Sequence, residues 1–283
     1  MSKHIPALSQ KQVVACFPKR PRDSHKGLFG TVAVIGGDAG MIGAPLLAAR
    51  AALKLGAGCV HAGLLTENAP RVDMQQAELM LHSASAALRL PGVDVLAIGC
   101  GLGTSIAAQK ILYEALMRDT ALVIDADALN ILARQSDLQD DLRIRQATSV
   151  LTPHPGEASR LLGCDCKTIQ ADRVAAVRKL AQKFACSVVL KGADSLCATR
   201  DGRIYQNKSG NPGMSSAGMG DVLTGMIAAF IAQGMSADDA LLLAVHLHGA
   251  AGDALAQQGI SVGMTASDLT EWARWLLNQW HLG

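Results

Sequence analysis

Short runs of apolar residues alternate along most of the chain with longer stretches in which apolar and polar residues recur at helical spacing. The short runs predict buried strands and the longer stretches predict helices. A repeated strand-then-helix order is typical of a mostly parallel sheet that helices cover on both faces. Strands are predicted over residues 31–36, 59–65, 93–99, 121–124, 150–152 and 188–191, with a short edge strand or hairpin arm over 203–207.

The predicted helices follow these strands and also fill the C-terminal part of the chain. The last helix has Thr265 as its cap and Asp268 three positions later, which is a capping-box pattern. Helices are predicted over residues 10–16, 44–55, 106–118, 172–184, 219–233, 236–257 and 266–279, with a further one starting within 154–163. Residues 1–29 are otherwise a polar lead-in.

Glycine-rich and polar loops follow the predicted strands at their carboxyl ends. In open parallel sheets the ligand binds outside these ends, where residues from separate loops meet. One site at this edge of the sheet is therefore predicted. The loops are 36–43, 99–105, 125–130, 152–157, 191–195 and 210–221.

The composition narrows the class of protein. Of the 283 residues, 49% are hydrophobic and 18% are charged, which is enough apolar surface for a large core and excludes long disordered stretches. No linker, repeat or low-complexity segment divides the chain, so we expect one domain over residues 1–283. The net charge of +2 gives no basis for nucleic-acid binding, and no apolar run is long enough to span a membrane.

The seven cysteines are scattered, and the first residues lack the apolar core of a signal peptide. Such a set is typical of reduced thiols, so a cytoplasmic protein is expected. No paired Cys or His spacing predicts a metal site. His246 and His248 lie two apart on a helix, face different directions and are interpreted as packing or interface residues. The last helix is expected to dock through Trp272, Trp275 and Trp280, which could instead form a subunit contact.

The most informative segment is 210–221, GNPGMSSAGMGD, which leads into a helix that has no charge from Val222 to Ala232. Such a helix must be buried on nearly every side, so its free N–H groups open at the bottom of a site. The helix dipole and the unpaired donors attract phosphate to that end. Asp221 lies in the first turn. An anion site beside one carboxylate can move a phosphoryl group onto a hydroxyl.

Two other glycine loops invite a nucleotide-binding interpretation. The 36–43 loop does not match the dinucleotide fingerprint and could be an ordinary turn, although the small Ala44 after it permits close approach of a ligand. Residues 99–103 follow a strand, and Asp125 ends a strand about 20 residues later, as in a dehydrogenase site. The third glycine falls one position early, which disfavours that interpretation. A Walker P-loop is excluded, because the chain has no Gly-Lys dipeptide.

Charged side chains at the strand ends have both structural and ligand-binding explanations. Asp125 and Asp127 could polarise the site or its magnesium, or Asp127 could simply cap a helix. His154, between two prolines, could be structural or contact a ligand. Glu157 could complement a helix dipole or order a water on magnesium. Lys191, followed by glycine, could end in a turn or hold a nucleotide phosphate or ribose.

Together these segments resemble the ribokinase-like superfamily, whose marker is a GxGD motif at the start of a buried helix, here Gly218 to Asp221. Within it the chain is most similar to the ADP/ATP-dependent NAD(P)H-hydrate dehydratases. The matching segments reach from His25 to Gly234 and include DADALN, LTPHPGEASRLLG and VLKGADS, and SVGMTASDL extends the likeness nearly to the end. Two departures are Met219, where alanine or threonine is usual, and Cys100, which interrupts a glycine run.

The resemblance implies a ribokinase-like three-layer α/β/α sandwich with a mostly parallel central sheet. It implies repair of NADH or NADPH that has been hydrated at C6 of the nicotinamide ring (NADHX or NADPHX). ADP, or ATP in some relatives, phosphorylates the C6 hydroxyl with Mg²⁺ as cofactor, and phosphate then leaves. Some members carry an N-terminal epimerase domain as well. This chain resembles the stand-alone enzyme, which works with a separate epimerase and whose relatives form tetramers.

Residue roles follow from the match to the motifs of the family. Asp221 would accept the proton of the C6 hydroxyl, and its place at a helix N-terminus is expected to lower its pKa. Glu157 would order a water on magnesium. Contacts to the hydrated nucleotide are implied for Ala44, Gly103, His154 and Asp221, contacts to ADP or AMP for Lys191, Gly192, Ala193, Asp194, Ser195 and Gly220, and an anion hole for the N–H groups of Ala217, Gly218, Met219 and Gly220.

Two other functions stay open at this point. One is a small-molecule kinase of the same fold, acting on a thiazole, pyridoxal or a sugar alcohol, which would release a stable phosphorylated product. The other is a nucleotide-binding regulator without catalysis, which the intact GMGD motif disfavours. The choice between ADP and ATP rests on the family likeness alone, and the choice between NADHX and NADPHX is not decided.

Overall fold

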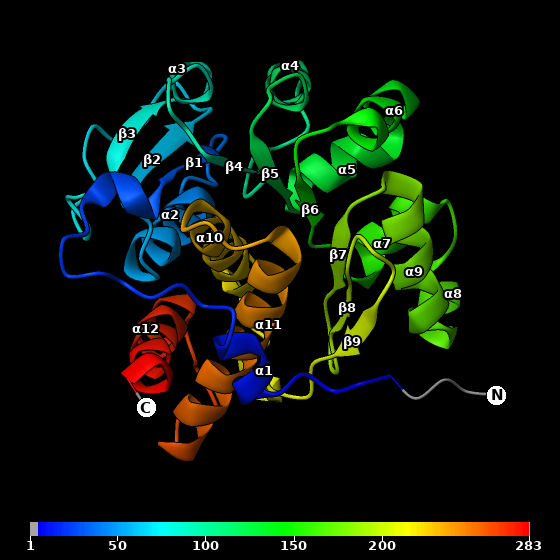
Figure 1. Cartoon of the computed structure of the whole chain (residues 1–283). Coiled ribbons are helices and arrows are strands. Elements are labelled where there is room, and N and C mark those ends of the chain that lie inside the picture. Colours follow the sequence, from blue (N-terminus) through cyan, green and yellow to red (C-terminus); the bar gives the residue numbers. More distant parts are fainter. Residues whose placement is uncertain (1–4, 283) are drawn as a thin grey trace.

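A nine-stranded sheet runs through the computed structural model, which describes residues 5–282 (Figure 1). Its strand order is β3-β2-β1-β4-β5-β6-β7-β8-β9. Neighbouring strands from β3 to β7 pair in parallel, and β7, β8 and β9 pair antiparallel. The expected mostly parallel sheet is thus confirmed. The strands are β1 (Thr31–Gly36), β2 (Cys59–Leu64), β3 (Met80–Ser83), β4 (Val95–Ile98), β5 (Ala121–Ile124), β6 (Ser149–Leu151), β7 (Ser187–Leu190), β8 (Leu196–Ala198) and β9 (Ile204–Gln206).

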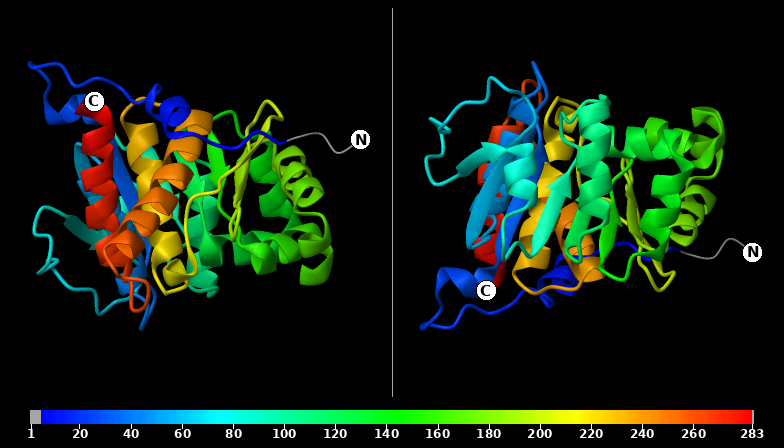
Figure 2. Two further views of the ribbon diagram at one scale, coloured as in Figure 1. Left: turned by 90° about the horizontal axis from the view of Figure 1, so that it is seen from below. Right: turned by 90° about the horizontal axis from the view of Figure 1, so that it is seen from above.

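Helices cover both faces of the sheet, which confirms the three-layer α/β/α arrangement (Figure 2). One face packs against α1 (Gln10–Val14), α2 (Gly43–Lys54), α10 (Met219–Ala232), α11 (Ala237–Gln257) and α12 (Ala266–Leu282). The other packs against α3 (Ala84–Leu88), α4 (Ile106–Leu116), α5 (Ala126–Arg134), α6 (Ser136–Ile144), α7 (Pro155–Leu162), α8 (Cys166–Ala171) and α9 (Arg173–Phe184). Between residues 5 and 282, no helix combines the length and the apolar character that crossing a membrane requires.

Strands β3 and β8 and several short helices were not predicted. Strand β3 lies at the edge of the sheet and has no buried residue, so it lacks the apolar run that marks the inner strands. Strand β8 has only three residues, too few to show a periodicity. The chain was predicted to have a short edge strand or hairpin arm over 203–207, and β9 fills that role by pairing with β8.

Helix α10 is enclosed, as its lack of charge predicted. Its side chains from Val222 to Phe230 are all buried, and α10 contacts α2 and α11 on either side. Gly225 lets the backbone of α10 lie close to the backbone of α2, because a Cβ atom at this position would lie 2.0 Å from the carbonyl oxygen of Ala48 in α2. The backbone contact with α2 therefore holds the N-terminus of α10 in place.

Helix α12 begins as expected and docks through two of the three tryptophans predicted to dock it. Asp268 accepts hydrogen bonds from the Thr265 backbone at 3.1 Å and its hydroxyl at 2.6 Å, while Thr265 Oγ1 accepts from the Asp268 backbone at 3.2 Å. Trp272 and Trp280 pack against the core. Trp275 is 52% exposed and takes no part in that docking.

Candidate functional site

The loops after the parallel strands meet at the N-terminus of α10, as their positions predicted. The backbone of Lys191, after β7, donates to the carbonyl of Pro153, after β6, at 2.9 Å. The backbone of Asp127, after β5, donates to the carbonyl of Gly99, after β4, at 3.2 Å. Loops from separate strands are therefore tied directly to one another at the carboxyl edge of the sheet.

The first turn of α10 presents open N–H groups. Gly218 is the N-cap, and its φ of 88° lies in the left-handed region that favours glycine. Within the part of the chain described here, no side chain caps this helix, so its first N–H groups stay available to a ligand. A Cβ atom on Gly220 would lie 3.2 Å from Lys191 Nζ. Amides and an ammonium group thus face the same space.

Asp125 is the buried centre of the charged groups at this edge, with 1% of its surface exposed. Its Oδ1 accepts from Lys191 Nζ at 2.8 Å and from the Ala126 backbone at 2.8 Å, and its Oδ2 accepts from Thr224 Oγ1 at 2.8 Å. Burial lowers the pKa of Lys191, but the Asp125 and Glu157 carboxyl groups outweigh burial and raise it above its usual value. Lys191 therefore stays cationic.

Asp125, and not Asp127, caps helix α5, so the proposed capping role of Asp127 was wrong. The backbone geometry explains the exchange, because Asp125 is the last extended residue before the helix. Asp127 lies inside the first turn and accepts from the Gly103 backbone at 2.9 Å. Asp127 thus connects the N-terminus of α5 to the loop after β4.

His154 and Glu157 form a capping box at the start of α7. His154 Nδ1 accepts from the Gly156 backbone at 3.0 Å, and Glu157 Oε2 accepts from the His154 backbone at 2.8 Å. Because Nδ1 accepts, Nε2 carries the ring proton, and it faces Glu157 Oε1 at 3.3 Å. Burial raises the pKa of Glu157 to about 7, although the nearby Lys191 opposes this shift. Burial and Lys191 both lower the pKa of His154.

The pKa of Asp221 is raised to about 6, so the expected lowering was wrong. Burial is the main cause, and the charge of Asp125 adds to it. A hydrogen bond from the fully buried Cys100 thiol and the charge of Lys191 act in the opposite direction. Desolvation of the carboxylate therefore exceeds the favourable effect of the helix terminus.

A pocket of about 530 Å³ opens beside the N-terminus of α10. Residues predicted to hold the adenosine nucleotide line it together, namely Lys191, Gly192, Ala193, Asp194, Ser195 and Gly220. The rest of the lining comes from residues 207–212, Met214, Ser215, Met219, Leu223, Val245, His248 and Gly249.

Part of this lining was missed by sequence reasoning. His248 had been interpreted as a packing or interface residue, yet it lines the pocket. Its Nε2 donates to the carbonyl of Met219 at 2.9 Å, and burial lowers its pKa to about 4, so the ring is neutral at physiological pH. His246 packs as expected, against the Trp280 ring and beside the Asn207 amide. No pattern in the sequence separates these two histidines.

The residues predicted to contact the hydrated coenzyme lie outside that pocket lining. Ala44 is in the first turn of α2, and Gly103 is tied to Asp127, whose charge contributes to the raised pKa of Asp221. His154 lies at the start of α7 with about half of its side chain exposed. The structure thus lines the pocket with the predicted nucleotide residues, and places Ala44, Gly103 and His154 after β1, β4 and β6 at the same edge of the sheet.

The donor set fits a magnesium ion that a nucleotide brings with it. Among residues 5–282, no three His, Cys, Asp or Glu side chains are grouped to hold a metal by themselves. Mg²⁺ keeps several waters and is held by one or two carboxylates together with substrate phosphates. Glu157 and Asp221 are carboxyl groups next to the pocket edge that suit this indirect mode of binding.

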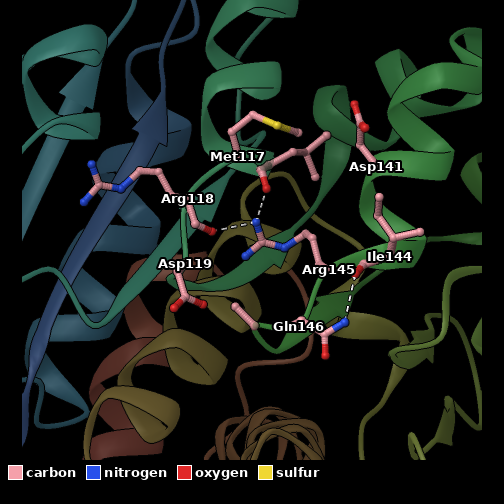
Figure 3. A pocket seen from close by; sticks show the side chains of 9 residues that line it. Met117, Arg118, Asp119, Asp141, Ile144, Arg145 and Gln146 are labelled. Carbon is pink, nitrogen blue, oxygen red and sulfur yellow. Dashed lines mark hydrogen bonds between the residues drawn. The ribbon is translucent and has the colours of Figure 1, made fainter.

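A second pocket, of about 270 Å³, lies away from this site (Figure 3). It is formed by the ends of α4 and α6, just before β5 and β6, so it belongs to the amino edge of the sheet. Arg145 extends across it and donates to the carbonyls of Leu116, Arg118 and Thr120. These bonds satisfy the C-terminus of α4 and give the pocket a structural explanation.

Comparisons with known proteins point to one family. A family model described as NAD(P)H-hydrate dehydratase matches residues 32–274. The ADP-dependent (S)-NAD(P)H-hydrate dehydratase of Neisseria meningitidis is 45% identical over 267 residues, which cover 93% of this chain and 90% of that protein. The bifunctional NAD(P)H-hydrate repair enzyme of Coxiella burnetii is 42% identical over 96% of this chain, which spans 55% of that protein.

The fold also matches solved structures. The ADP/ATP-dependent NAD(P)H-hydrate dehydratase of Bacillus subtilis, co-crystallised with ATP and Mg²⁺, superimposes with a TM-score of 0.86 at 28% identity. The match covers 99% of this chain and 100% of that chain. A ribokinase-like superfamily protein of Enterococcus faecalis superimposes with a TM-score of 0.86 at 26% identity over 100% of this chain and 99% of that chain, which confirms the expected ribokinase-like fold.

Proposed function

We propose that this chain, which belongs to the family of NAD(P)H-hydrate dehydratases, catalyses the ADP-dependent dehydration of (S)-NADHX and (S)-NADPHX to NADH and NADPH. The activity is that of a hydro-lyase. One observation carries the proposal: the open first turn of α10 lies beside Asp221 and Lys191, at the mouth of a pocket lined by the predicted nucleotide residues.

The chemistry explains why such an enzyme consumes ADP. Hydroxide is a poor leaving group and phosphate a good one. The C6 hydroxyl oxygen attacks the terminal phosphorus of ADP and AMP departs. The C6–O bond then breaks as the lone pair of the ring nitrogen forms a C=N bond, and loss of the C5 proton restores the dihydropyridine ring. The products are AMP, phosphate and NAD(P)H, so one difficult step becomes two easier ones.

The residues divide between the two substrates. In this proposal the nucleotide lies in the pocket of about 530 Å³, and the hydrated coenzyme approaches Asp221 from the side of α2 and α7. Lys191, Gly192, Ala193, Asp194, Ser195 and Gly220 bind ADP, the coenzyme contacts Ala44, Gly103, His154 and Asp221, and the N–H groups of Ala217, Gly218, Met219 and Gly220 bind the transferring phosphoryl oxygens.

Asp221 is proposed as the group that accepts the proton of the C6 hydroxyl. Its pKa of about 6 makes it a stronger base than an ordinary carboxylate while leaving it mostly ionised at neutral pH. Its place in the first turn of α10 puts it next to the proposed anion hole. Proton acceptance and phosphoryl binding are therefore properties of one helix end.

Magnesium, carried by the nucleotide, would neutralise phosphate charge when bound. Glu157 is proposed to order a water of that ion. Its carboxyl group is 4.0 Å from Lys191 Nζ, the ammonium that faces Gly220, and this proximity supports the proposed indirect role.

Further proposals concern the setting of the enzyme. The chain is a single domain that works with a separate NAD(P)H-hydrate epimerase, a proposal supported by the chain spanning only 55% of the bifunctional NAD(P)H-hydrate repair enzyme of Coxiella burnetii. It acts in the cytoplasm as a homo-oligomer, for which a tetramer is our specific expectation.

The test is to incubate the purified chain with Mg²⁺, each of ADP and ATP, and each of NADHX and NADPHX. We expect the near-ultraviolet absorbance of the dihydronicotinamide ring to return, with AMP and phosphate formed from ADP. Accumulation of a stable phosphorylated alcohol, detected by mass spectrometry, would instead identify a kinase. Nucleotide binding with neither outcome would leave only a regulator and would overturn the proposal.

A further inference from the structure

Thr224 is a fully buried hydroxyl residue one turn after Asp221 in α10. It does not line the pocket, yet its Oγ1 donates to Asp125 Oδ2 at 2.8 Å. Asp125 in turn accepts from Lys191 Nζ at 2.8 Å through its other oxygen. A continuous series of hydrogen bonds therefore runs from the interior of α10 to the ammonium group at the pocket.

The ammonium at the end of this series faces the first turn of α10. A Cβ atom on Gly220 would lie 3.2 Å from Lys191 Nζ and 3.6 Å from Asp125 Oδ2. The ammonium is thus beside the N–H groups where the transferred phosphoryl group is proposed to lie. Its position there depends on the orientation of the Asp125 carboxylate, because that carboxylate is its direct partner.

The orientation of Asp125 depends on a donor at each oxygen. The Ala126 backbone and Lys191 hold Oδ1, whereas Thr224 is the only donor to Oδ2 within the described part of the chain. Without the Thr224 hydroxyl the carboxylate can rotate, and the ammonium can bridge both oxygens and leave its place beside Gly220.

We propose that Thr224 and Asp125 are positioning residues that hold the Lys191 ammonium against the N-terminus of α10, where it meets the charge of the transferring phosphoryl group. This inference rests on the proposed function. Thr224 acts only through Asp125 and Lys191, since it is buried beneath them and reaches no substrate. Small displacements of a charged group at such a site carry large effects on rate.

The experiment compares Thr224→Val, which keeps the shape of the side chain and removes its hydroxyl, with Thr224→Ser, which keeps the hydroxyl. Thr270→Val is the matched control, because Thr270 is also a buried helical threonine, bonded only to the carbonyl of Ala266 at 3.0 Å. We expect Thr224→Val to lower kcat about ten- to hundredfold with little change in the KM for ADP. Thr224→Ser should recover most of the rate, and Thr270→Val should match the wild type.

A double-mutant cycle with Lys191→Met separates positioning from general packing. If Thr224 acts through the ammonium, Thr224→Val should have little further effect in single-turnover assays once Lys191 is methionine. An equal loss in both backgrounds, a fully active Thr224→Val variant, or a Thr224→Ser variant as slow as Thr224→Val would each overturn the proposal. If the wild-type chain fails to convert NADHX with ADP, the proposed function fails, which is a different result from these.

Discussion

At the scale of single residues, the surroundings of Asp221 decide when it can act as a base. Its pKa of about 6 means that the carboxylate forms as pH rises through that value. We expect kcat/KM to fall below about pH 6 as Asp221 becomes protonated. Asp221→Asn should lower kcat by about 10²–10⁴ with ADP binding mostly retained. The measurements are a pH–rate profile and calorimetric titration with ADP.

Asp137→Asn is the control for this variant. Asp137 is also an aspartate in the first turn of a helix, but it is exposed and lies on α6. Its replacement should leave the profile unchanged. An acid limb near the ordinary aspartate pKa of about 4 would show that the helix terminus outweighs burial, contrary to our assignment.

Gly220 offers a second residue-scale prediction. A methyl group there would meet Lys191 Nζ at 3.2 Å and displace it from the first turn of α10. We expect Gly220→Ala to reduce kcat at least about tenfold, while thermal stability is kept because alanine favours the helix. Steady-state kinetics alongside thermal unfolding check this. A fully active variant would show that the ammonium need not be held beside the helix end.

Site residues that belong to a short sequence motif could be predicted from the sequence. Roles that depend on a partner far away in the sequence could not. The glycines and the acid of the GMGD motif follow one another, so the sequence alone was enough to predict the open first turn of α10 and to single out Asp221. Thr224 and its partner Asp125 are 99 positions apart, and His248 and its partner Met219 are 29 apart. The direction of the Asp221 pKa shift was missed for the same reason, since the helix end is visible in the sequence and the burial is not.

At the scale of elements, the contact between α10 and α2 determines where the helix end lies. A Cβ atom on Gly225 would lie 2.0 Å from the Ala48 carbonyl oxygen, so any side chain pushes the two helices apart. We expect Gly225→Ala to destabilise the fold by about 1–3 kcal/mol and to lower activity, because the N-terminus of α10 moves with the helix. Urea unfolding and kinetics measure both effects.

Gly43→Ala is the matched control for stability. Gly43 is also a helical glycine, at the start of α2, but an added Cβ atom would meet nothing within 4 Å. Its stability should stay the same or rise slightly, because alanine favours a helix. Equal destabilisation by both substitutions would argue against the close approach of α10 and α2.

The elements that could be predicted are those whose burial repeats along the sequence. The inner parallel strands and the long helices were recognised within a few residues, because each is apolar or amphipathic over its whole length. Strands β3 and β8 and helices α3, α6 and α8 were missed. The pairing of β3 with β2 depends on a distant segment, and short helices such as α3 carry few periods of any pattern.

At the scale of the whole molecule, the order of strands and loops was enough to predict where the candidate site lies. Every predicted loop lies at the carboxyl edge, since a parallel sheet brings all those ends together. The electrostatic balance of the assembled site is a property of the folded chain alone. The partly buried ammonium of Lys191 lies among the carboxyl groups of Asp125 and Glu157, and its charge also lowers the pKa of Asp221.

This balance predicts how stability depends on pH. Glu157 and Asp221 have pKa values of about 7 and about 6 in the folded chain, above their ordinary values. Groups with raised folded pKa values favour folding at low pH, and this advantage is lost as pH rises through the folded values.

Replacing both carboxyl groups by amides, Glu157→Gln with Asp221→Asn, removes the buried charges. The double variant should therefore exceed the wild type in unfolding free energy by about 1–3 kcal/mol at pH 8, and the difference should shrink at pH 5. Urea unfolding of the ligand-free chain at both pH values tests this, and a wild type more stable than the variant at pH 8 would show that the two carboxylates stabilise the fold.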